Sequence, residues 1–125
     1  MKGLWITTDN VVTEREVTGD RLYSLYDGMF EIVRPTGLTR PLVFLVDESG
    51  VIKGLPDNQT GCVLYGTAKH GHRIAGDILI LKETMGEEGY ELTGLSDGDL
   101  RALADKYDIR PTINHSVRKK KQERY

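Results

Sequence analysis

The stretch that most constrains the fold is Leu42-Val43-Phe44-Leu45-Val46, an uninterrupted run of apolar residues. A strand points successive side chains to opposite faces of a sheet, so a run without polar residues predicts a strand that is buried on both faces. Other elements must then cover both faces of that sheet. The chain has 125 residues, which is about the length of a single domain.

The remaining strands and two helices are predicted from local patterns. Segments rich in apolar and β-branched residues are predicted strands: residues 2–8, 11–18, 29–34 and 74–82. The first two would form a hairpin through Asp9-Asn10, and the glycine-rich acidic segment 84–94 is expected to be an exposed loop or an irregular hairpin. A short helix is expected at residues 21–26, where the apolar residues fall on one face.

A longer helix is predicted at residues 96–107, because Ser96 is a natural N-cap residue and two aspartates follow in the first turn. The sequence therefore predicts an α+β fold, with a small, mostly antiparallel sheet, one short helix and one C-terminal helix. We expect a single domain over residues 1–110 and a basic C-terminal tail over 111–125.

Charge is unevenly distributed along the chain. The net charge is −2, yet the last ten residues carry five basic side chains and one acidic one. A phosphate backbone binds a cationic face, so nucleic-acid binding by the folded part is disfavoured. The tail is the one part that could supply such binding, through Arg118, Lys119, Lys120 and Lys121. The plainer interpretation is a solvated tail without a partner.

Signals of an enzyme, a cofactor or a membrane protein are missing from the sequence. It contains no phosphate-binding loop, no dinucleotide-binding turn and no nucleophile elbow, so we expect no catalytic site and no cofactor. Cys62 is better interpreted as a small buried side chain than as a nucleophile. A single cysteine, and apolar runs too short for a membrane span or a signal peptide, indicate a cytoplasmic protein that does not contact membranes.

The stretch "KHGHR" holds the most unusual local chemistry of the folded part. His70 and His72 would share one face of a strand and could bind a metal with Cys62 or His115, but the spacing matches no common zinc pattern, so we expect no metal. An exposed basic turn is the plain interpretation. The functional alternative is a cationic lip that binds an anion or a partner's carboxylates, formed by Lys69, His70, His72 and Arg73.

The stretch "VDESGVIKGLPDN" predicts a corner of the chain. Residues 47–50 fit a hairpin turn, after which residues 51–53 would run back as a second short strand. Pro56 then stiffens the following loop. We expect Lys53 and Asn58 to project from this stiff backbone, where they could meet a ligand in a preorganised geometry.

Three stretches carry a resemblance to a known family: "VDESGVIKGLPDN", "LYSLYDGMFEIV" and "IAGDILIL". In this order and spacing they resemble the uncharacterised family called domain of unknown function 3846, small proteins common in phages, plasmids and other mobile elements. The resemblance covers roughly residues 2–108. It leaves out "QTGCVLYGTAKHGHR" and the basic tail, where anything particular to this chain would lie.

The resemblance implies a bacterial cytoplasm and a phage or mobile-element gene, a setting in which small proteins often act by binding. We therefore expect a non-enzymatic binding protein that blocks a host defence protein or sequesters a small anionic ligand such as a nucleotide. Its expected contacts are Lys53, Asn58, Lys69, His70, His72 and Arg73. The alternatives left open are a nucleic-acid accessory protein acting through the tail, a metalloprotein or enzyme built on Cys62, His70 and His72, and self-association through open strand edges.

Overall fold

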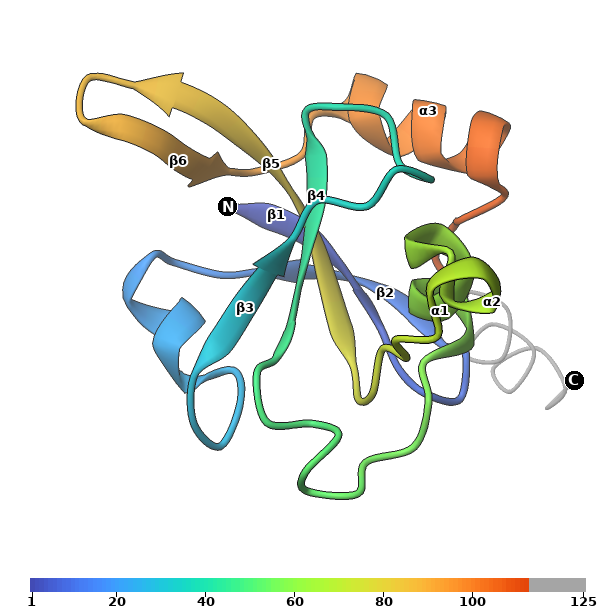
Figure 1. Cartoon of the computed structure of the whole chain (residues 1–125). Helices are drawn as coiled ribbons and strands as arrows, with labels where there is room; N and C mark the ends of the chain where they lie inside the picture. Colours follow the sequence, from blue (N-terminus) through green and yellow to red (C-terminus); the bar gives the residue numbers. More distant parts are fainter. Residues whose placement is uncertain (113–125) are drawn as a thin grey trace, which may run out of the picture.

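The computed structural model describes residues 1–112 and has the expected α+β fold, with short helices around a six-stranded antiparallel sheet (Figure 1). The strands are β1 (Lys2–Ile6), β2 (Val12–Glu16), β3 (Phe30–Val33), β4 (Leu42–Asp47), β5 (Ile78–Gly86) and β6 (Gly89–Thr93). The helices are the 3₁₀ helix η1 (Asp20–Ser24), α1 (Gln59–Tyr65), α2 (Thr67–His70) and α3 (Asp97–Tyr107). The strand order is β2-β1-β5-β4-β3, and β6 pairs with the outer half of β5.

The apolar run forms the first five residues of β4, and all five are buried, as expected for a strand covered on both faces; Asp47, the sixth residue of the strand, is also buried. Phe44 and Val46 point to the sheet face that packs against Leu64 of α1 and Leu103 of α3. Leu45 points to the opposite face, where η1 and the segment around it cover a second core. Because each face of the sheet carries its own core, residues 42–46 are all apolar, whichever face their side chains point to.

The C-terminal helix α3 begins as predicted, with Ser96 as its N-cap. The Ser96 hydroxyl accepts a hydrogen bond from the Asp99 amide at 3.1 Å, and the Asp99 carboxylate accepts one from the Ser96 amide at 2.7 Å. This reciprocal capping satisfies two amide groups at the helix start. Leu103 on the inner face of the helix is fully buried.

Several predicted boundaries differ from the structure. The hairpin of β1 and β2 is confirmed, but residues 51–53 form turns and not a returning strand. Strand β5 begins at Ile78, later than predicted, and it continues through the segment expected to be irregular to form a regular hairpin with β6. Thr112, assigned to the tail from the sequence, donates its amide to the Val12 carbonyl at 2.7 Å.

Helices α1 and α2 were not predicted; they lie in "QTGCVLYGTAKHGHR", one of the two stretches that the resemblance leaves out. Helix α1 ends at Gly66, whose φ of 85° is a left-handed conformation that glycine adopts without steric cost. Leu64 of α1 packs into the core on the sheet face that α3 also covers, whereas α2, which follows α1 directly, has no buried residue (Figure 1). Within residues 1–112, no helix has the length and apolar character that crossing a membrane requires.

Candidate partner-binding site at the β3 edge

Asn58 does not project from the loop as expected, because its side chain is fully buried. Its Oδ1 accepts a hydrogen bond from the Gly61 amide at 2.9 Å and caps α1. Its Nδ2 donates to the carbonyls of Ile6 and Gly76, both at 3.0 Å. The amide thus fastens α1 to β1 and to the chain before β5, and it offers nothing to a ligand.

Lys53 also forms an ion pair within the fold. Its ammonium group lies 2.8 Å from the buried carboxylate of Asp47 and also donates to the Asp27 carbonyl. A buried carboxylate needs such a counterion, because leaving it alone in the interior is costly. Lys53 therefore stabilises the corner after β4 rather than lying ready for a ligand.

The four basic residues expected to form a cationic lip do not converge. Arg73 donates to the carboxylate of Asp57 and to the Leu55 carbonyl. Lys69 and His70 lie exposed on α2, whereas His72 lines a pocket together with Arg73. An anion at this place would thus have to compete with Asp57 for the one arginine.

Cys62 is half-buried and contacts the backbone of Ile74, whose amide lies 3.3 Å from its sulfur. This contact fits the interpretation as a small packed side chain. Among residues 1–112, no three histidine, cysteine or acidic side chains are placed to hold a metal. His115 and the tail cations Arg118, Lys119, Lys120 and Lys121 lie outside the described residues.

Strand β3 lies at one edge of the sheet and, within the described residues, pairs only with β4. In antiparallel pairs, residues that bond to the partner strand alternate with residues whose N–H and C=O groups point away. The Glu48 amide donates to the Met29 carbonyl at 3.0 Å, directly before the β3–β4 ladder in which Glu31 lies opposite Val46. This bond fixes which residues of β3 face outward.

By this alternation, Glu31 and Val33 bond to β4, whereas the N–H and C=O groups of Phe30 and Ile32 point to the free edge. Among the described residues, these four outward groups have no hydrogen-bond partner. Two consecutive outward-facing positions are the template that an added strand requires.

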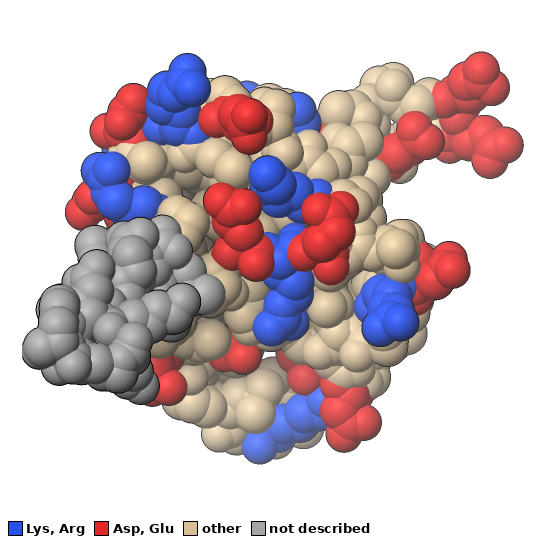
Figure 2. Space-filling model, turned by 180° about the vertical axis from the view of Figure 1, so that it is seen from behind, with Lys and Arg blue, Asp and Glu red and all other residues tan. Residues whose placement is uncertain are grey.

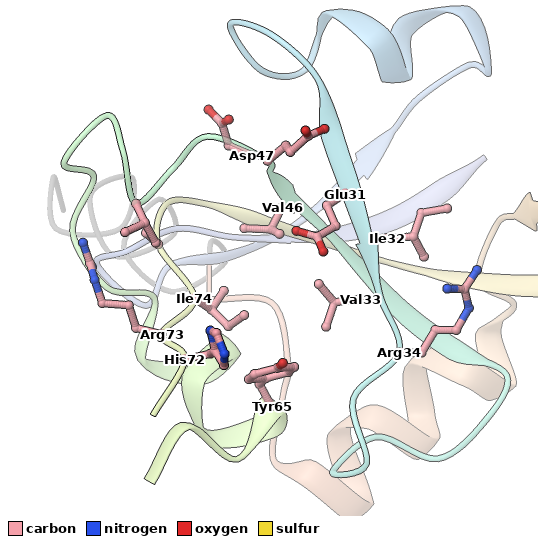
Figure 3. A pocket seen from close by; sticks show the side chains of 13 residues that line it. Glu31, Ile32, Val33, Arg34, Val46, Asp47, Tyr65, His72, Arg73 and Ile74 are labelled. Atoms are coloured by element: carbon pink, nitrogen blue, oxygen red, sulfur yellow. The ribbon is translucent and has the colours of Figure 1, made fainter. Parts of the chain in front are cut away.

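A pocket of about 440 Å³ opens directly beside this edge. Glu31, Val33 and Val46 lie on one side of it, with Ile74, His72 and Tyr65 facing them across the space (Figure 3). Ile32 and Arg34 point to the other side of β3 (Figure 3). The pocket lies on the sheet face that carries the α1 and α3 core, at a place that the helices leave uncovered.

Exposed apolar side chains surround the same end of β3. Ile52 is 90% exposed, and Val51 beside it lines the pocket. Met29 precedes β3 and is also largely exposed. On the opposite sheet face, the exposed ring of Tyr23 lies 5.4 Å from that of Phe30. Neighbouring exposed apolar side chains are typical of interaction surfaces.

The chain directly after β3 is held by an ion pair that sequence reasoning did not find. Arg34 donates two hydrogen bonds to the buried Glu83 carboxylate of β5, at 2.7 and 2.6 Å. These bonds lower the pKa of Glu83 against the opposing effect of burial. The bidentate pair fixes where β3 ends, so the edge is rigid at this point.

The sheet edge formed by β2, at the opposite end of the strand order, is protected. Its exposed residues Glu14, Arg15 and Glu16 are charged, and Thr112 bonds to Val12 where β2 begins. Charged edges discourage strand addition. Figure 2 shows acidic and basic side chains interspersed over one face of the molecule, with an acidic group at the projecting β5–β6 tip, so the described part has no continuous basic surface there.

The fold and this site define a class: a small α+β protein with a charged, protected β2 edge, an open β3 edge that borders a pocket, and a projecting β5–β6 hairpin in which β6 pairs only with β5 among the described residues. The chain belongs to the family described as "Domain of unknown function (DUF3846)", whose match covers residues 1–108. No curated protein matches it, and no solved structure does.

Proposed function

We propose that this protein is a non-enzymatic binding protein that captures an extended segment of a partner protein by strand addition at β3. The observation that carries the proposal is the outward-facing backbone of Phe30 and Ile32 at an edge that borders a pocket. The resemblance to mobile-element proteins makes a host protein, such as a component of host defence, the expected partner.

The neighbouring residues support a peptide segment over a small anion as the ligand. Lys53 and Arg73 are paired with Asp47 and Asp57, so they would bind an anion only by breaking these pairs. A strand added at β3 needs no such rearrangement. Its backbone would bond to the edge, and its alternate side chains would reach the pocket or the apolar surface around Phe30.

The proposal is tested by selecting random nine-residue peptides displayed on phage against the whole chain. The selected peptides are then measured against Ile32→Pro, which removes one outward N–H group without removing a bond to β4. We expect about tenfold weaker binding or more, because an edge hydrogen bond is lost and the proline ring obstructs the added strand.

The matched control is Glu14→Pro, which removes an outward N–H group from the β2 edge. The Thr7 amide donates to the Val11 carbonyl, so by the same alternation the N–H group of Glu14 points away from β1. Binding should be unchanged in this variant and in a chain that ends at Thr112. A failed selection, or selected peptides that bind Ile32→Pro as tightly as the parent chain, would refute strand addition at β3.

A further inference from the structure

Resting on the strand-addition function proposed above, we infer that the β3 edge selects a partner segment of the pattern apolar–basic–apolar, with a lysine or arginine placed opposite Glu31. The inference follows from the register of β3, from the unpaired charge at its centre and from the apolar side chains on its other face.

The register sets which side chain of an antiparallel partner meets which surface. Phe30 and Ile32 face outward, so two partner residues separated by one position would bond to them. Their side chains would lie on the sheet face of Phe30 and Ile32. The residue between them would lie opposite Glu31 and extend over the pocket face.

Charge at the pocket face favours a cation at that middle position. Glu31 is exposed and, among the described residues, has no ion-pair partner, and the same is true of Glu48, which directly follows β4 and also lines the pocket. Neither nearby arginine neutralises this charge, because Arg73 in the pocket is paired with Asp57, and Arg34 points to the other side of β3 and is paired with Glu83. Opposite charges facing each other across two strands are stabilising, and like charges are destabilising.

The flanking positions meet an apolar surface. Phe30 and Ile32 are half-buried, and the exposed Tyr23 ring lies against Phe30. Apolar side chains on the partner's flanking residues would remove this surface from water. A charged residue there would lose hydration without gaining a counterion, so the pattern is selective at all three positions.

The test uses three synthetic peptides that differ at one residue, a central lysine, serine or glutamate between two valines, flanked by threonines. Their dissociation constants are measured by calorimetry at low salt with the whole chain. We expect the lysine peptide to bind roughly fivefold to tenfold more tightly than the glutamate peptide, with serine between them. The difference should shrink in high salt.

Reversing the charge of Glu31 tests whether this residue sets the preference for the central peptide residue, separately from whether peptides bind at all. In Glu31→Lys the order of the three peptides should invert, whereas in Glu88→Lys, which makes the same charge change at the β5–β6 turn, the order should stay. Peptides that bind in an Ile32→Pro-sensitive way but show no dependence on the central residue would overturn this inference and leave strand addition standing. If none of the three peptides binds while peptides selected against the chain bind in an Ile32→Pro-sensitive way, this inference is overturned and strand addition stands.

Discussion

The side-chain amide of Asn58 makes three hydrogen bonds inside the fold and is fully buried. Replacing it by alanine would leave the carbonyls of Ile6 and Gly76 and the cap of α1 without their partner. We expect Asn58→Ala to lower the free energy of unfolding by about 3 kcal/mol.

Urea denaturation measures this loss, and the exposed neighbour Gln59 supplies the control. Gln59→Ala should cost less than about 0.5 kcal/mol, because it leaves the buried network intact. A loss below about 1 kcal/mol for Asn58→Ala would mean that water replaces the amide and that the loop is not fixed in this way.

The ion pair between Glu83 and Arg34 makes the free energy of unfolding depend on pH, with lower stability in acid. Hydrogen bonds from Arg34 hold the pKa of Glu83 below the ordinary value. The stabilisation is therefore present above the unfolded-state pKa and is lost as the pH falls through the folded-state pKa. We expect the free energy of unfolding to decrease as the pH falls from neutral to below 4.5, the ordinary pKa of this carboxyl group.

Denaturation curves across this range, recorded for Glu83→Gln, should show a shallower decrease and a lower stability at neutral pH. Glu87→Gln, at the exposed β5–β6 turn, should follow the parent curve. If the free energy of unfolding fell equally steeply with pH in the parent chain and in Glu83→Gln, the ion pair of Arg34 and Glu83 would not be the cause of the acid sensitivity.

Among the elements, β3 allows a direct test of its register. Ile32→Pro should keep the fold and cost about 1 kcal/mol, because the lost N–H group faces solvent. Glu31→Pro should cost more than about 2 kcal/mol, because its N–H group bonds to β4. Thermal unfolding of the two variants measures the difference, and the reverse order would place the outward groups on Glu31 and not on Ile32.

The elements also show how far the sequence predicts this structure. The apolar run of β4 and the capped helix α3 were predictable, because periodicity and N-cap chemistry are local signals. Helix α1 has only seven residues, with Gly61 inside it, which is too little periodicity to detect. Residues 51–53 have strand-like composition, but the turns after β4 carry them away from the sheet.

The candidate site was harder to predict than the fold. The strand at β3 was expected, but which strands lie at the edges depends on pairings between segments far apart in the chain. Likewise, Arg34 and Glu83 are separated by 49 positions, so no local pattern indicates their contact. Asn58 follows a proline turn, where an exposed polar residue is the ordinary expectation, and only the packing of α1 buries it.

For the whole molecule, the open edge raises the question of self-association. Two β3 strands pairing antiparallel, with Phe30 of each bonded to Ile32 of the other, would place Glu31 opposite its own copy, and like charges at this position are destabilising. We expect the chain to be monomeric at micromolar concentrations and Glu31→Val to form dimers. Sedimentation velocity distinguishes the two, with Glu88→Val as the control that should stay monomeric. Dimers of the parent chain that Ile32→Pro dissociates would contradict the role assigned to Glu31.

The most direct test of strand addition at β3 is amide hydrogen exchange, followed by NMR, at Phe30 and Ile32 with and without a peptide selected against the chain. We expect fast exchange at both residues in the free protein, because their N–H groups face solvent, and strong protection when the peptide is bound. Glu31 and Val33, bonded to β4, should be protected in both states. Unchanged exchange at Phe30 and Ile32 on saturation with a bound peptide would show that the peptide binds elsewhere and would contradict the central claim.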